Sequence, residues 1–183
     1  MVDFSNVEII QHSKWWVDNV VVGLNFCPFA KPVIAAGGLS YTVVNEQGLE
    51  QCLTALMTQV SCLDENTSIE TALLIYPLGF EAFNDYLDFV AVAEELLSVE
   101  GFDGVYQLAS FHPDYCFDGS QYDDAANYTN RSPYPMLHLL REDSIEEVLS
   151  GVTDPEKIPS RNIEFARKKG AGEMQELLNK CKS

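Results

Sequence analysis

Arginine is absent from the first 130 of the 183 residues, and lysine occurs there only at Lys14 and Lys31. The same stretch holds 19 of the 28 acidic residues, and the whole chain has a formal net charge of -17. Proteins bind nucleic acids and anionic membrane surfaces through patches of lysine and arginine. The negative electrostatic field of this chain would repel both. We therefore predict no nucleic acid partner and no membrane partner.

Long apolar runs and paired cysteine motifs are absent as well. No stretch approaches the ~18 apolar residues of a membrane-spanning helix, and the first residues do not combine a basic segment with an apolar one as a secretory signal does. The five cysteines are odd in number and form no CxxC motif, which argues against a disulfide framework. We expect reduced thiols in a cytoplasmic protein.

The chain does have enough apolar residues for a buried core. Its 183 residues are 46% hydrophobic and show neither a repeat nor a low-complexity linker, so we predict a single globular domain over residues 1–183. Short apolar runs bounded by turn residues predict the strands, which we place at residues 39–44, 69–76, 105–111 and 136–141.

Capping patterns and the helical spacing of apolar residues predict the helices. The first helix has Val7 on its apolar face and ends near Cys27-Pro28. A later helix runs over residues 80–99 with Leu87 facing inward, and two or three short helices follow the last strand. The cap residues that we predict are Ser5 with Glu8, then Asn45, then Asp143 with Glu146.

The predicted order of elements is a helix, then βαβαββ, then further helices. This order favours an α/β (or α+β) fold, in which helices flank a mixed sheet of about four strands with a parallel portion. It also matches the order of elements in the thioredoxin-like arrangement. Because a fold does not determine a function, the functional hypotheses depend on individual residues.

The residues best suited to chemistry lie between Phe111 and Arg141, around the long connection that joins the last two predicted strands. Connections of this length are usually functional or disordered, and the aromatic residues and prolines here argue against disorder. His112 and Asp114 could act as catalytic base and acid, because imidazole titrates near neutral pH and a carboxylate can fix its tautomer. The same pair together with Asp118 could instead bind a divalent metal such as zinc, manganese or iron.

Arg131 is the first arginine of the chain, and a guanidinium group binds a carboxylate or a phosphate as a two-pronged donor. We predict that Arg131, Arg141, Asn127 and Asn130 bind a small anionic molecule. Alternatively, the Asp and Asn side chains of this segment form turns and the arginines pair with them, which would make the segment structural.

Cys27 and His138 are two further candidates. The motif CPFA that starts at Cys27 is similar to the cysteine motif of glutaredoxins and omega-class glutathione transferases, where a thiolate lies at the start of a helix. In this chain a helix precedes Cys27, and the negative end of its dipole would disfavour a thiolate. Alternation along the last strand places His138 on the same face as Met136 and Leu140, where a histidine is more often a core residue than a ligand.

Five segments that together cover almost the whole chain resemble an uncharacterised family known as domain of unknown function 1415. The resemblance implies no activity, because none is assigned to that family. The segments are GLNFCPFAKPV (23–33), ETALLIYP (70–77), FHPDYCFDG (111–119), DDAANYTNRSPYPMLHLLRE (123–142) and IPSRNI (158–163). The family motif is matched at Cys27, Pro28, His112, Pro113, Asn127, Asn130, Arg131, His138 and Arg141.

Two functions remain open at the level of the sequence. The first is an enzyme that acts on a small anionic molecule by metal-assisted chemistry or by acid-base chemistry of His112 and Asp114. The second is a non-catalytic protein that binds a small ligand or a partner and in which residues 111–141 form a structural polar loop.

Overall fold

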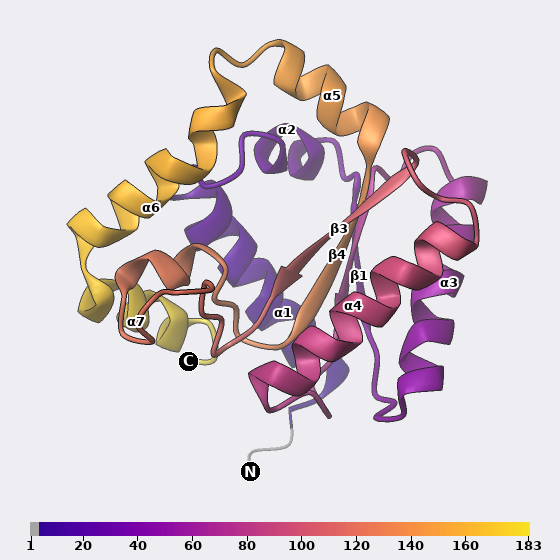
Figure 1. Ribbon diagram of the computed structural model, residues 1–183, viewed down its shortest axis with the longest axis horizontal. Coiled ribbons are helices and arrows are strands. Elements are labelled where there is room, and N and C mark those ends of the chain that lie inside the picture. The colour runs from indigo at the N-terminus through magenta and orange to yellow at the C-terminus, as the bar shows by residue number, and fades with distance from the viewer. Residues whose placement is uncertain (1–3) are drawn as a thin grey trace.

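A four-stranded sheet lies between two layers of helices in the computed structural model, which describes residues 4–183 (Figure 1). Residues 1–3 of the predicted domain lie outside the described residues. The mixed α/β class and all four predicted strands are confirmed. The strands are β1 (Leu39–Val43), β2 (Thr71–Ile75), β3 (Tyr106–Phe111) and β4 (Met136–Arg141).

The strands lie in the order β1-β2-β4-β3. β1 pairs parallel with β2, whereas β4 pairs antiparallel with both β2 and β3. The predicted order along the chain is confirmed, but the order across the sheet differs slightly from the thioredoxin-like one, because β4 returns into the space between β2 and β3. The carboxyl ends of β1, β2 and β3 therefore meet at one edge of the sheet, beside the amino end of β4.

Two long helices, α3 (Leu49–Glu65) and α4 (Phe83–Val99), cover one face of the sheet (Figure 1). The buried residues of α3 recur every three or four positions, so they form one apolar stripe that faces the sheet. These residues are Cys52, Leu56, Val60 and Leu63.

Two predicted details of these helices are wrong. Gly48, not Asn45, occupies the cap position of α3, and the Asn45 amide instead donates a hydrogen bond of 3.2 Å to Asn6. Leu87 of α4 is 42% exposed, because Tyr86 and Val90 take the face of the helix that packs on the sheet.

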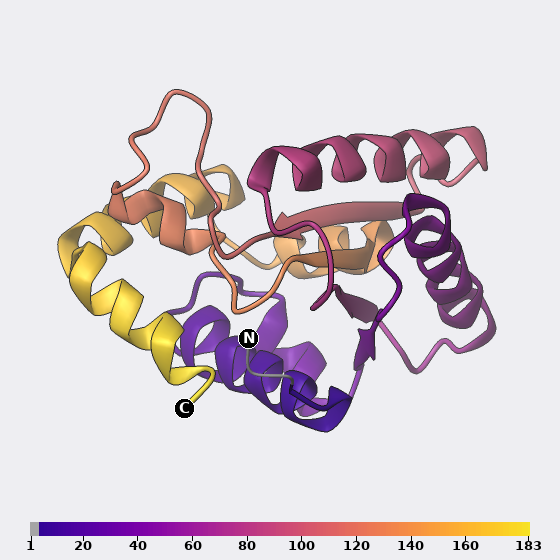
Figure 2. The same cartoon turned by 90° about the horizontal axis from the view of Figure 1, so that it is seen from below.

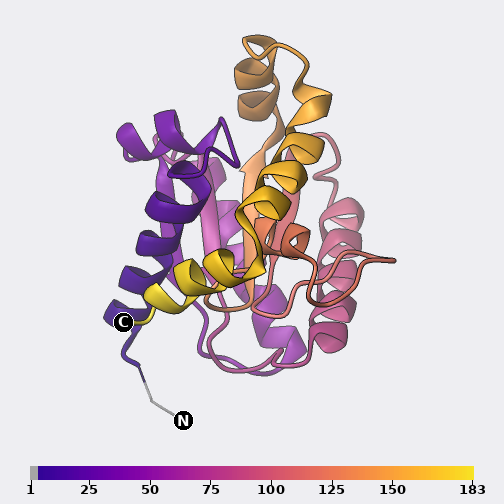
Figure 3. The same ribbon diagram turned by 90° about the vertical axis from the view of Figure 1, so that its left-hand side faces the viewer.

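The other face is covered by helices from both ends of the chain, as the view in Figure 2 and the side view in Figure 3 show. Figure 3 also shows that the C-terminal segment ends beside the start of the first helix. The elements in this layer are α1 (Asn6–Trp16), the π-helix η1 (Val17–Val22), α2 (Ala30–Ala35), α6 (Ile158–Lys169) and α7 (Ala171–Lys180).

The first helix begins with the predicted capping box of Ser5 and Glu8, which is confirmed. It continues without interruption into η1, a π-helix whose wider turn shifts the direction of the side chains that follow. Val7 is 65% exposed, so the prediction that it faces the core is wrong; the buried positions of the two helices are Ile9, Ser13, Trp16, Val17 and Val20.

The remaining elements are short. The C-terminal part contains α5 (Glu142–Ser150) and the 3-10 helix η3 (Pro155–Lys157) before α6, which confirms the predicted short helices. The capping box predicted at Asp143 does not form, because α5 already begins at Glu142. Another 3-10 helix, η2 (Ala125–Thr129), lies in the connection between β3 and β4. Within residues 4–183, no helix has the length and the apolar character needed to cross a membrane.

Candidate functional site

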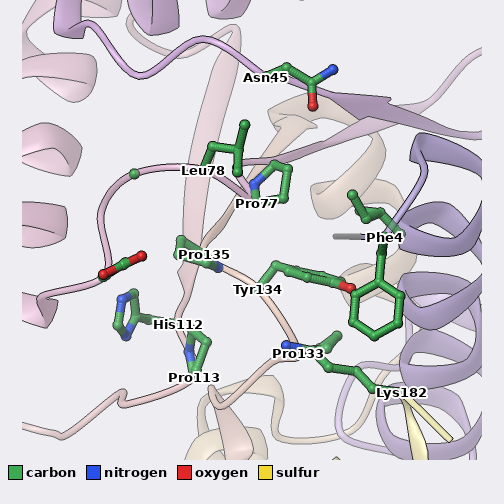
Figure 4. Close-up of a pocket in the computed structure, with 13 residues that line it drawn as sticks. Phe4, Asn45, Pro77, Leu78, His112, Pro113, Pro133, Tyr134, Pro135 and Lys182 are labelled. Atoms are coloured by element: carbon green, nitrogen blue, oxygen red, sulfur yellow. The ribbon is translucent and has the colours of Figure 1, made fainter. Parts of the chain in front are cut away.

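A pocket of about 370 Å³ opens at the edge of the sheet where the carboxyl ends of the three parallel strands meet (Figure 4). Ligands of open α/β sheets commonly bind at this edge, because the loops that leave the strands converge there. We call it the carboxyl-edge pocket. The residues that the strand ends contribute are Asn45 after β1, Pro77, Leu78 and Gly79 after β2, His112 and Pro113 after β3, and Pro133, Tyr134 and Pro135 before β4.

The loop after β2 has a strained backbone that His112 stabilises. Gly79 has a φ of 104° and Phe80 a φ of 54°, and a left-handed conformation is costly for a bulky residue such as phenylalanine. The carbonyl of Phe80 accepts a hydrogen bond of 2.8 Å from the His112 ring, and the Phe80 ring stacks on Phe89 at 4.3 Å. These two contacts hold the loop in the shape that forms one wall of the pocket.

His112 uses both of its ring nitrogens in bonds to the backbone. The amide of Asp114 donates a hydrogen bond of 3.0 Å to Nδ1, so the proton of the neutral ring lies on Nε2 and is donated to Phe80. The side chain is 1% exposed, and this burial lowers its pKa. The geometry therefore gives the imidazole a positioning role, and the predicted role of His112 as a catalytic base stays a prediction.

Asp114 and Asp118 lie on the surface of the connection between β3 and β4. Asp114 accepts a hydrogen bond of 2.7 Å from the hydroxyl of Tyr122, and this bond raises the pKa of that tyrosine. Among residues 4–183, no group of three or more His, Cys, Asp and Glu side chains is placed to hold a metal ion. The structure thus does not bring His112, Asp114 and Asp118 together as the predicted metal ligands.

Arg131 lies inside the connection between β3 and β4. Its guanidinium group donates hydrogen bonds of 3.1 Å to the carbonyl of Tyr115 and 2.7 Å to the carbonyl of Tyr122. It also lies between the rings of Tyr122 and Tyr128, each 4.5 Å from the guanidinium carbon. Arg131 is 4% exposed and does not line the carboxyl-edge pocket, so its contacts hold the loop together, and its predicted role in binding an anion stays a prediction.

The two asparagines bond the same loop. The amide of Asn127 is fully buried, accepts a hydrogen bond of 3.0 Å from the Phe117 backbone and donates one of 2.9 Å to the carbonyl of Gln121. Asn130 donates a weaker bond of 3.3 Å to the carbonyl of Ser110 on β3. The contacts of Asn127 and Arg131 match the structural alternative that the sequence left open.

Arg141 lies at the carboxyl end of β4, which is the opposite edge of the sheet from the pocket. Its guanidinium group bonds the carbonyls of Leu63 and Ile69 and the hydroxyl of Tyr106. It joins α3 to the strands there, and the structure does not bring it together with Arg131.

Cys27 lies in the turn between η1 and α2. The sequence placed it at the end of a helix, but the structure shows that a second short helix follows it. Burial raises the pKa of the Cys27 thiol, while the backbone amides of Ala30 and Phe29 oppose that shift. Burial of the thiol therefore disfavours the reactive thiolate form.

Three residues of the pocket region escaped the sequence analysis. The hydroxyl of Tyr134 lies 2.7 Å from Nδ1 of His12, and the ammonium group of Lys182 lies 4.2 Å from the centre of the Tyr134 ring. Burial raises the pKa of Tyr134 to about 12, so its hydroxyl is protonated and can donate to His12. Figure 4 shows Lys182 and Phe4 on the opposite side of the pocket from His112.

Comparison with curated proteins and with solved structures finds no match to this chain. A family model does match, over residues 8–176, and its description is "Protein of unknown function" (DUF1415). This range includes the strands, the loop that Arg131 stabilises and nearly all of the carboxyl-edge pocket. The chain therefore belongs to the DUF1415 family of proteins of unknown function.

Proposed function

We propose that the protein binds a small anionic molecule in the carboxyl-edge pocket. The observation that carries this proposal is the position of Lys182, which lines a pocket formed by the ends of all four strands. Among the described residues of that pocket it is the one lysine or arginine, in a chain with a net charge of -17. An anionic group of a ligand would pair with Lys182 in a partly desolvated position.

The pocket also has features that narrow the class of ligand. Glu81 lines it together with Lys182, so a ligand that carries a hydrogen-bond donor or an amino group beside its anionic group fits the two charges. The four prolines Pro77, Pro113, Pro133 and Pro135 give the walls a restricted backbone. A pocket with such walls loses little conformational entropy when a ligand binds.

The polar loop supports the non-catalytic alternative. Both ring nitrogens of His112 bond backbone groups, and the guanidinium of Arg131 bonds two carbonyls, so neither is free for a substrate without rearrangement. Acid-base chemistry by His112 and Asp114 would require the Phe80 loop to open. We therefore propose that the protein binds a ligand without catalysis and that the connection between β3 and β4 shapes the pocket.

Replacing Lys182 by glutamine should weaken binding of the ligand about tenfold, which corresponds to about 1.4 kcal/mol. The ligand is sought by thermal shift in a panel of amino acids, small dicarboxylates and phosphate esters, and affinities are then measured by calorimetry. Lys180→Gln is the matched control, because it removes one exposed charge from the end of α7 outside the pocket. Equal affinities of the two variants would contradict the proposal.

A further inference from the structure

A second cavity, of about 150 Å³, lies between the sheet and the layer formed by α1, η1 and α2. It shares no lining residue with the carboxyl-edge pocket. Its walls are apolar and come from elements far apart in the sequence, with Trp16, Val33, Leu73 and Leu140 among them. The polar exceptions are Cys27, Thr71 and His138. We call it the inner cavity.

A second pocket adjoins the inner cavity on the side toward the protein surface. An outer pocket of about 300 Å³ shares the wall residues Val21, Cys27 and Phe111 with it, so Cys27 lies where the two spaces adjoin. The outer pocket also contains the amide side chains of Asn130 and Asn162. A small molecule could thus enter the inner cavity past Cys27.

The hydrogen bonds of His138 determine which atoms it offers to a ligand. The hydroxyl of Thr71 has one proton and donates it to the carbonyl of Leu139 at 2.6 Å. The 2.5 Å contact between Thr71 and His138 therefore has Nε2 of His138 as the donor, which leaves the lone pair on Nδ1. No group in residues 4–183 donates a hydrogen bond to that Nδ1. His138 is half-buried in the otherwise apolar wall of the cavity, so a ligand that brings a hydrogen-bond donor would find an unoccupied acceptor there.

We propose that the inner cavity binds a small aromatic molecule that carries one hydrogen-bond donor, as a phenol does. The size fits, because an apolar cavity of about 150 Å³ accepts a benzene ring. The apolar walls would bury the ring, and its hydroxyl would donate to Nδ1 of His138. This site is independent of the anion site proposed above.

The probe for this site is 4-fluorophenol, whose fluorine signal broadens in the NMR spectrum when the molecule binds a protein. We expect saturable binding to the full chain. Fluorobenzene is the comparison, because it has the same ring without a donor, and it should bind several-fold more weakly. Failure of 4-fluorophenol to bind, or equal binding of fluorobenzene, would overturn the proposal.

A pair of variants locates the binding. Ala109 lines the inner cavity, so Ala109→Leu fills part of its volume and should weaken binding of 4-fluorophenol at least tenfold. Ala91→Leu makes the same change on the exposed face of α4 and should bind as the unaltered protein does. Unchanged binding by Ala109→Leu would place the probe elsewhere and overturn the assignment. If that variant does not fold, the comparison of the two probes in the unaltered protein still decides the matter.

Discussion

Replacing Arg131 by alanine is expected to lower the free energy of unfolding by about 3 kcal/mol. The buried guanidinium bonds the carbonyls of Tyr115 and Tyr122 and lies between two tyrosine rings. Alanine would leave both carbonyls without these donors and remove two cation–π contacts, each worth about 1 kcal/mol. Urea denaturation at neutral pH, followed by circular dichroism, measures the difference.

Two further variants test whether the loss of stability in Arg131→Ala comes from the two-pronged hydrogen bonding of the guanidinium group. Lysine at position 131 keeps the charge but cannot reach both carbonyls, so Arg131→Lys should recover less than half of the loss. Arg167→Ala removes an exposed arginine whose partner, Asp124, lies at the start of η2, and should cost at most about 1 kcal/mol. If Arg131→Ala and Arg167→Ala unfold at the same urea concentration, the loop does not depend on Arg131.

The strands could be predicted from the sequence because their signal is local. Every residue of β2 is buried, so an apolar run bounded by Pro77 was enough to place it. The start of α3 was not predictable in the same way. Asn45 has the residue type of a helix cap, but its side chain bonds Asn6, which lies 39 positions earlier in the chain. A local pattern carries no information about such a partner.

The candidate site was predictable only in part. His112, Asn127 and Arg131 stand out in the sequence as polar residues of an aromatic loop, and the structure shows all three buried. Their partners are mainly backbone groups, which have no signature in a sequence. The carboxyl-edge pocket was not predictable because it needs Lys182, near the end of the chain, over the ring of Tyr134 in the connection between β3 and β4. Only the folded chain brings these residues together.

The protein is expected to lose stability in acid between about pH 6.5 and pH 4 because of His138. Its ring lies in the largely apolar wall of the inner cavity and bonds Thr71, and desolvation lowers its pKa from 6.5 to about 4. The unfolded chain therefore binds a proton in this window that the folded chain does not, so the free energy of unfolding falls as the pH falls. The loss of unfolding free energy that is due to His138 reaches about 3 kcal/mol at about pH 4, and there is no such loss above about pH 6.5.

His138→Gln isolates this contribution from the many carboxylates of the chain. Glutamine can still donate to Thr71 but does not titrate, so the variant should lack the additional acid sensitivity. The pKa of Asp124 is lowered to about 2 by Arg167, and its effect appears below the window in which His138 acts. The measurement is urea denaturation of both proteins at several pH values from 7 to 4. Parallel curves would mean that His138 titrates normally and that the inner cavity already admits water to its ring.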